Sequence, residues 1–160
     1  MSVLILTTGG TIDKLYFDAL SEYQIGDSVV DRLLKTARVA MPYRVHELLR
    51  KDSLELTDDD RALIVRAVAD APEQRIVITH GTDTMTDTAR ALAGRTNKTI
   101  VLVGALAPAR FADSDATFNL GMAFATAQVA GPGVWIAMNG TIFDGTKVRK
   151  DRAINSFVAA

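Results

Sequence analysis

The feature that most constrains the fold of this chain is a regular alternation of short apolar runs with segments of helical periodicity. The apolar runs are Val3–Thr7, Tyr43–Leu49, Arg75–Thr79, Thr99–Val103 and Val134–Met138. Between them, apolar residues recur at helical spacing over residues 27–37, 57–71, 85–94 and 115–130. Strands that alternate with helices in this way predict βαβ units and a parallel sheet with right-handed crossovers. We therefore predict a single α/β domain with a doubly wound, flavodoxin-like sheet, strand order 2-1-3-4-5, and helices on both faces.

Composition narrows the class of protein further. The 160 residues suit one domain, which we expect to span 1–160, and such a length buries roughly 70% of the unfolded surface. A net charge of −1 disfavours a nucleic-acid or membrane binder. The absence of cysteine excludes disulfides, thiolate catalysis and zinc–thiolate sites. Because the apolar run near Met1 is too short for a signal peptide or a membrane span, we expect a cytoplasmic location.

Hydroxyls and carboxylates gather in the turns that follow three of the five expected strands. They are Thr8 and Thr11 after the first strand, Asp52 and Ser53 after the second, and Thr82 and Asp83 after the third. In the predicted strand order these turns meet at the switch point of the sheet, where ligands bind in open α/β folds. Glycines beside them let the backbone approach a ligand, and the free N–H groups at the following helix start suit an anion or oxyanion. The sequence thus predicts a small-molecule site at this edge.

Each of these residues also has a structural alternative. A Ser, Thr or Asp at a helix start is more often a cap, and for Thr82 and Asp83 capping and catalysis are equally favoured by the local sequence. The acidic run 58–60 fits a solvated first helical turn and not a metal site. His46 and His80 are too few for a metal site built on imidazoles, and no nucleotide-binding glycine motif or nucleophile elbow occurs. We therefore expect no metal or cofactor.

The basic residues near the end of the chain also have a structural interpretation that involves no function. They are Lys147, Arg149, Lys150 and Arg152. Taken by themselves, most of them are typical of a solvated terminus. The residues alone therefore predict a site built from hydroxyls, carboxylates and one possible lysine, without naming the reaction.

Two motifs resemble those of a known enzyme family and thereby indicate a reaction. The segments Thr8-Gly-Gly-Thr-Ile12 and Thr79-His-Gly-Thr-Asp-Thr-Met85 resemble the two signature motifs of the bacterial-type L-asparaginase family. Further agreement lies in Lys51-Asp-Ser53, Val103-Gly-Ala105, Phe118-Asn-Leu120, Met138-Asn139 and Asp144-Gly145. The resemblance covers essentially the whole chain but only the amino-terminal domain of the usual two-domain enzyme. The smaller carboxyl-terminal domain is therefore expected to be absent.

The resemblance implies a set of catalytic roles. Thr11 would be the nucleophile that attacks a side-chain amide and forms an acyl-enzyme. Tyr23, on the long loop between the first strand and the first helix, would hydrogen-bond the nucleophile and close over the substrate. Thr82, Asp83 and Lys150 would form a second cluster, in which Lys150 is placed by the weaker match Val148-Arg-Lys150.

The resemblance also implies how the substrate would be held. The residues that it assigns to substrate binding are Gly10, Asp52, Ser53, Gly81, Thr82, Asp83 and Ala105. Ser53 and Asp83 would bind the substrate's α-carboxylate and α-ammonium groups, with Asp52 and Gly81 lining the pocket. The Thr82 amide and the backbone near Ala105 would orient the amide group and its developing oxyanion.

The expected activity is hydrolysis of L-asparagine to L-aspartate and ammonia. Whether asparagine is preferred over glutamine stays open, because the two differ by one methylene group, which changes the binding free energy in a pocket by only about 1–3 kcal/mol. We expect a homo-oligomer whose partner surface closes the site, with Tyr16, Phe17 and Leu20 as candidate contacts, although these side chains suit lid packing equally well. Two other functions stay open: an amino-acid-binding or regulatory domain with reduced catalysis, and an amidase for a larger substrate such as an aminoacyl-tRNA. The near-neutral charge disfavours the latter.

Overall fold

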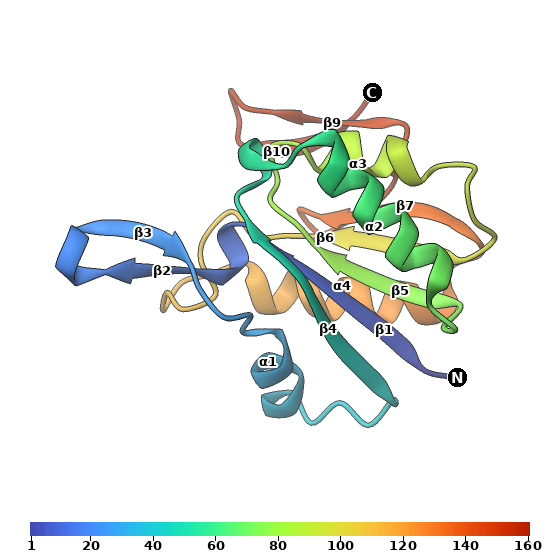
Figure 1. Ribbon diagram of the computed structural model, residues 1–160, viewed down its shortest axis with the longest axis horizontal. Coiled ribbons are helices and arrows are strands. Elements are labelled where there is room, and N and C mark those ends of the chain that lie inside the picture. The colour runs from blue at the N-terminus through green and yellow to red at the C-terminus, as the bar shows by residue number, and fades with distance from the viewer.

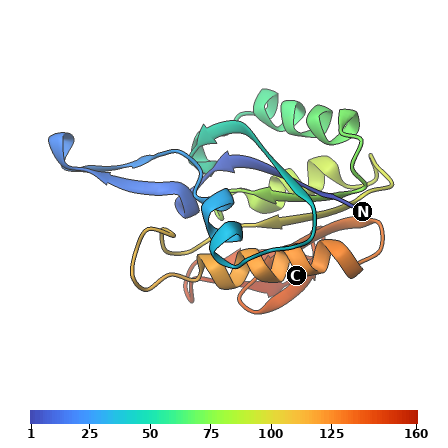
Figure 2. The same cartoon turned by 90° about the horizontal axis from the view of Figure 1, so that it is seen from below.

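The computed structural model, which describes residues 1–160, consists of a six-stranded sheet between two layers of helices (Figures 1 and 2). In spatial order the strands are β4 (Tyr43–Lys51), β1 (Val3–Gly9), β5 (Arg75–Thr79), β6 (Thr99–Val103), β7 (Gly133–Met138) and β8 (Thr141–Asp144). The first five strands are parallel and β8 adds antiparallel to β7. The predicted order 2-1-3-4-5 is therefore confirmed, with one further edge strand.

Each face of the sheet is covered by two helices. The helices are α1 (Val30–Thr36), α2 (Asp58–Asp70), α3 (Met85–Leu92) and α4 (Ala116–Val129). In β1, Val3 and Ile5 pack in one core with α1 and α4, whereas Leu4 and Leu6 pack in the other with α2 and α3. Because successive side chains of a strand point to opposite faces, an uninterrupted apolar strand fills both cores. The helices on both faces confirm the predicted doubly wound architecture.

Local sequence explains where some of the helices begin. A capping box begins α2: Thr57 Oγ1 accepts from Asp60 N–H at 3.2 Å, and Asp60 Oδ2 accepts from Thr57 N–H at 2.9 Å. At α1, Ser28 Oγ accepts from Val30 N–H at 3.3 Å, but Asp27 caps nothing.

The long loop expected after the first strand is instead a β-hairpin. Its strands are β2 (Lys14–Phe17) and β3 (Glu22–Ile25), joined by a 3₁₀ turn over Asp18–Leu20. Tyr16 pairs with Tyr23, and their rings stand edge to face with centroids 5.5 Å apart. Ser21 takes a left-handed φ of 50° that reverses the chain. We call residues 14–25 the lid hairpin, which projects away from the sheet in Figures 1 and 2.

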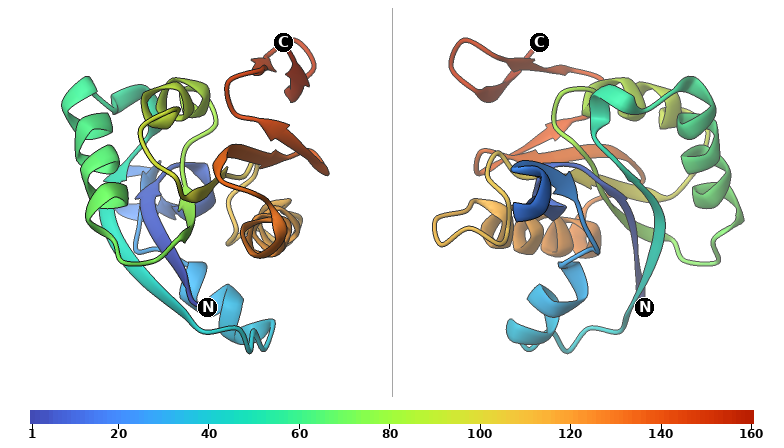
Figure 3. Two further views of the ribbon diagram at one scale, coloured as in Figure 1. Left: turned by 90° about the vertical axis from the view of Figure 1, so that its right-hand side faces the viewer. Right: turned by 60° about the vertical axis from the view of Figure 1, so that its left-hand side comes forward.

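The basic residues near the end of the chain lie on a folded segment. As expected of most of them, Lys147, Arg149 and Arg152 are exposed, whereas Lys150 is half-buried. After β8 the chain forms an antiparallel pair, β9 (Val148–Asp151) and β10 (Ser156–Ala159), that folds back beside the sheet (Figure 3). Val148 and Phe157 are buried in the core shared with α2 and α3, so the segment is anchored by apolar burial. Asn139 Oδ1 also accepts from Phe157 N–H at 2.7 Å. None of the helices has the length and apolar character needed to cross a membrane.

Candidate active site

The three turns predicted to meet do lie against one another at the carboxyl ends of β1, β4 and β5. Gly10 has a φ of 87°, and a Cβ atom there would lie 2.4 Å from the Gly81 nitrogen. A Cβ on Gly81 would lie 2.6 Å from the Ser53 Cβ. Only glycine permits this backbone contact. Thr11 and Thr82, each next in sequence to one of these glycines, therefore stand on adjoining turns.

Lys150 reaches this edge from β9, 67 residues beyond Asp83 in the chain. Its ammonium nitrogen donates to Thr82 Oγ1 at 2.7 Å and lies 3.0 Å from Asp83 Oδ1. The Lys150 side chain is only 13% exposed, so the pair is sheltered from water on the lysine side. A second cation, Arg152, lies 3.5 Å from the same Asp83 oxygen. The structure thus brings Thr82, Asp83 and Lys150 together and adds an arginine that the sequence did not suggest.

Asp52 forms an ion pair with a lysine of the lid hairpin. Its Oδ2 lies 3.2 Å from Lys14 Nζ, and its Oδ1 accepts from Leu54 N–H at 3.1 Å. Partial burial by itself raises the pKa of Asp52, but the Leu54 hydrogen bond and the charges of Lys14 and Lys150 outweigh it and hold that pKa below its ordinary value. Asp52 is therefore anionic at neutral pH. Nothing in the spacing of the sequence indicated its pairing with Lys14.

Two of the predicted substrate-binding positions are buried and held by hydrogen bonds. Ser53 is 1% exposed, and its Oγ accepts from Thr84 N–H at 3.3 Å, which leaves the serine proton free to donate. Ala105 is also 1% exposed and follows Gly104, whose carbonyl accepts from Asn119 Nδ2 at 3.0 Å. These contacts fix the turns after β4 and β6 against the starts of α3 and α4.

Tyr23 stands apart from the nucleophile candidate. It is 54% exposed on the lid hairpin, its ring lies 6.0 Å from that of Phe111, and no hydrogen bond joins its hydroxyl to Thr11. Tyr23 does line a cavity of about 430 Å³ together with Lys14 and Asp52. The structure therefore brings Tyr23 to the same cavity as Asp52 but not into contact with Thr11.

Two buried titratable groups that no expectation included lie beside these turns. His80 Nδ1 donates to Gly81 O at 2.6 Å, so its Nε2, 2.7 Å from Thr88 Oγ1, accepts. Burial lowers the pKa of His80 to about 4, and the ring is neutral at pH 7. Burial likewise raises the pKa of Asp13 to about 6, although its hydrogen bond from Val29 N–H at 3.0 Å opposes this. No group of three or more His, Cys, Asp or Glu side chains is arranged to hold a metal ion.

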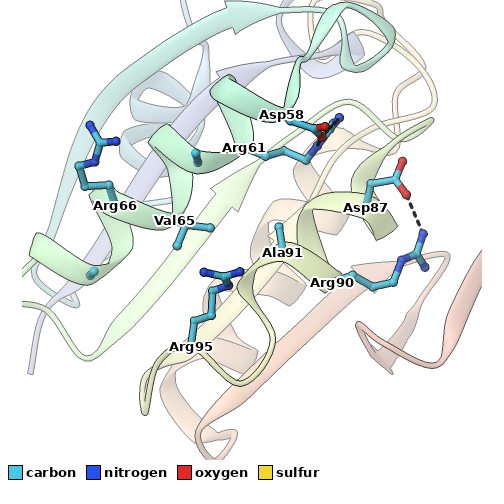
Figure 4. Close-up of a pocket in the computed structure, with 10 residues that line it drawn as sticks. Asp58, Arg61, Val65, Arg66, Asp87, Arg90, Ala91 and Arg95 are labelled. Carbon is cyan, nitrogen blue, oxygen red and sulfur yellow. Dashed lines mark hydrogen bonds and ion pairs between the residues drawn. The ribbon is translucent and has the colours of Figure 1, made fainter.

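A larger cavity, of about 590 Å³, lies on the outer surface between α2 and α3 (Figure 4). Its charged lining residues are Asp58, Arg61, Arg66, Asp87, Arg90 and Arg95. Two of the arginines are paired with aspartates on their own helices. We place the candidate site at the strand ends, because hydroxyls, carboxylates and a sheltered lysine converge there.

The comparisons with known proteins identify the family of the chain. The family model described as "Asparaginase, N-terminal" matches residues 2–157. This chain belongs to the asparaginase family. The L-asparaginase of Thermococcus kodakarensis is 34% identical over 160 residues, which cover 94% of this chain and 48% of that protein. Its solved structure superimposes with a TM-score of 0.87 at 31% identity, over 99% of this chain and 51% of the other.

Two further relatives of this asparaginase-family chain have different names. A glutaminase-asparaginase of Acinetobacter glutaminasificans is 34% identical over 168 residues, 93% of this chain and 49% of that protein. One component of the glutamyl-tRNA(Gln) amidotransferase of Methanococcus maripaludis is 42% identical over 84 residues, which cover 47% of this chain and 20% of that protein. The chain thus spans about half the length of the curated asparaginases it matches.

Proposed function

We propose that this asparaginase-family domain hydrolyses L-asparagine to L-aspartate and ammonia at the carboxyl ends of β1, β4 and β5. The observation that carries the proposal is the contact of Lys150 Nζ with both Thr82 Oγ1 and Asp83 Oδ1. A lysine that contacts both a hydroxyl and a carboxylate forms a relay that can move a proton. This relay lies on the turn that adjoins the one carrying Thr11.

In the first proposed step, the Thr11 hydroxyl oxygen attacks the side-chain amide carbon of asparagine. A threonine hydroxyl is a weak nucleophile at neutral pH and needs a partner that takes its proton. Tyr23, once the lid hairpin closes, or the unprotonated amine of Lys150 acting through the Thr82 hydroxyl takes that proton. The same group then delivers the proton to the amide nitrogen. The carbon–nitrogen bond breaks, ammonia leaves, and an ester joins Thr11 to the substrate. Such proton transfer accelerates a reaction by roughly 10²–10⁴-fold.

In the second proposed step, water attacks the ester carbon and the bond to Thr11 Oγ breaks. This releases aspartate and restores the threonine hydroxyl. The Thr82 amide N–H and the backbone near Ala105 donate to the oxygen that becomes negative in both steps. Donors of this kind contribute about 3–4 kcal/mol each to transition-state stabilisation.

Charges at the site suit an amino acid with both α groups free. Asp83 attracts the substrate's α-ammonium, and Ser53 can donate its free proton to the α-carboxylate, while Gly10, Asp52 and Gly81 line the pocket. We propose asparagine as the preferred substrate with weak activity on glutamine, since one methylene separates the two by only about 1–3 kcal/mol. The names of the relatives, L-asparaginase and glutaminase-asparaginase, support the choice of these two amino acids as candidate substrates.

We also propose that a second copy of the chain closes the open side of the site. Large apolar side chains stand exposed on the lid hairpin, with Tyr16 at 49%, Phe17 at 40% and Leu20 at 60%. Such a patch is typical of a protein interface. Light scattering should show an oligomer, and an active monomer would contradict this part of the proposal. The cytoplasmic location expected from the sequence stays a prediction, which fractionation of the source cells tests.

The decisive experiment measures ammonia release from asparagine and glutamine with purified protein. Thr11→Ala removes the nucleophile and Thr82→Val removes the hydroxyl that Lys150 contacts, so each should abolish hydrolysis while circular dichroism stays unchanged. Thr117→Ala, at an exposed position on α4, serves as the matched control and should retain full activity. Full activity in either site variant would overturn the assignment.

The same assay separates the remaining candidate functions. Saturable asparagine binding without ammonia release would favour an amino-acid-binding domain. Hydrolysis of a larger amide but of neither free amino acid would favour the amidase alternative, for which the partial match to an amidotransferase component is the supporting observation. The net charge of −1 argues against a tRNA-sized partner.

A further inference from the structure

The loop between β6 and α4 (residues 104–115) runs beside the base of the lid hairpin (Figures 1 and 2). From this loop, Arg110 reaches both chain segments at that base. Its Nη1 donates to Asp13 O at 2.8 Å and to Lys14 O at 3.5 Å, and its Nη2 donates to Asp27 O at 2.8 Å. One planar guanidinium thus joins the residues just before β2 to those just after β3. A guanidinium suits this role because its donors form a fixed fork.

Other hydrogen bonds also hold the base of the lid hairpin in place. Gly26 N–H donates to Asp13 O at 2.9 Å, and Ala109 N–H donates to Ile12 O at 3.1 Å. The buried Asp13 carboxylate accepts from Val29 N–H at 3.0 Å. The hairpin is therefore tied to the body at its base by both backbone and side-chain hydrogen bonds.

Beyond the base, the hairpin is held much less firmly. Its tip carries exposed residues, and halfway along it the Tyr23 ring rests 6.0 Å from the ring of Phe111, the residue next to Arg110. A two-stranded hairpin is at best marginally stable by itself in water. The base contacts must therefore supply the order that fixes where Tyr23 stands.

We propose that Arg110 is a positioning residue that clasps the base of the lid hairpin and thereby sets the position of Tyr23 relative to Thr11. This inference rests on the proposed role of Tyr23 in hydrolysis. The clasp fixes the base about which the hairpin closes. Without the clasp the hairpin samples more orientations, and the fraction of molecules in which Tyr23 reaches Thr11 falls. The rate falls with that fraction, because only the competent population turns over.

The first test measures the hairpin directly and needs no activity. Hydrogen exchange of the segment 14–29 and cleavage by chymotrypsin at Tyr16, Phe17 and Tyr23 are compared in the wild type, Arg110→Met and Arg110→Lys. Arg110→Met should raise both rates about tenfold, since the donors are lost while the stem is kept. Arg110→Lys should lie between, because an ammonium reaches one side of the base at a time. Arg66→Met, at an exposed arginine without an ion pair, is the matched control and should match the wild type.

The second test asks whether the clasp matters for hydrolysis of asparagine. We expect kcat/KM to fall about tenfold in Arg110→Met and to recover in part in Arg110→Lys, in step with the exchange of the hairpin. A purely structural role would instead lower the melting temperature and raise exchange in the core strand β5, and it would leave kcat of the folded fraction unchanged.

Two outcomes overturn the proposal. Wild-type exchange and cleavage in Arg110→Met would show that the arginine does not hold the hairpin. A loosened hairpin with unchanged kcat/KM would show that holding it does not position Tyr23. If the wild type hydrolyses neither asparagine nor glutamine, the proposed function fails, and the exchange and cleavage rates still decide whether Arg110 is a clasp.

Discussion

At the scale of single residues, the candidate site depends on a lysine that lies far from its partners in the chain. Lys150 donates to Thr82 and lies 3.0 Å from Asp83. Lys150→Met keeps the length of the side chain and removes the charge, so kcat for asparagine hydrolysis should fall by roughly 10²–10⁴-fold. Steady-state assays of ammonia release measure the effect.

A lysine three residues earlier provides the comparison. Lys147 is exposed, and its side chain makes no ion pair. Lys147→Met should therefore leave kcat and KM as in the wild type. Equal losses in the two variants would mean that the general charge of the tail matters and that the Thr82 contact does not.

At the scale of secondary-structure elements, the pair β9–β10 determines whether Lys150 arrives at the site. Asn139 holds β10 by accepting from Phe157 N–H, and it does so at a left-handed φ of 54°. Asn139→Gly relieves the backbone conformation but removes the acceptor, a loss of about 1 kcal/mol. We expect faster hydrogen exchange over residues 147–160 and a kcat/KM reduced several-fold.

Asn155 is a matched control for this effect. It lies between β9 and β10 at a φ of 50°, is exposed, and its side chain makes no hydrogen bond. Asn155→Gly should therefore leave both exchange and activity unchanged. If Asn139→Gly behaves in the same way, the Phe157 hydrogen bond does not place Lys150.

At the scale of the whole molecule, two buried groups oppose each other in the dependence of stability on pH. The folded-state pKa of Asp13, about 6, lies above its ordinary value of 3.8, so the folded protein binds the extra proton and loses stability as pH rises from 4 to 6. The folded-state pKa of His80, about 4, lies below 6.5, so the unfolded chain binds the extra proton and stability is lost as pH falls through that window. The two effects largely cancel between pH 4 and 6.

Asp13→Asn should remove the Asp13 contribution to the pH dependence of stability and leave that of His80. The amide oxygen can still accept from Val29 N–H, and the ionised carboxylate, which costs about 3 kcal/mol when buried above pH 6, is gone. Urea unfolding should therefore show higher stability at pH 7 and a steeper loss from pH 6.5 down to pH 4 than in the wild type. Asp113→Asn, at an exposed position, should follow the wild type throughout. An Asp13→Asn curve parallel to the wild type would contradict the opposing effects.

Sequence by itself determined the framework of this protein. The apolar strands and the periodic helices indicated a parallel sheet with helices on both faces, because an inner strand buries two faces and a helix buries one. The same reasoning failed for the lid hairpin and for β9 and β10. These segments pair with each other or return to the core after long separations, and their register depends on partners such as Phe157 that local periodicity does not reveal.

For the candidate site, too, part could be predicted from the sequence and part depended on the tertiary structure. The glycine turns placed Thr11, Ser53 and Thr82 at one edge, since parallel strands end together and Gly10 and Gly81 permit backbone contact. Only the tertiary structure decided which charges join them, as with Lys14 beside Asp52 and Arg152 beside Asp83. Short-range patterns specify the elements, whereas ion pairs and buried acids arise from residues that come together only when the whole chain folds.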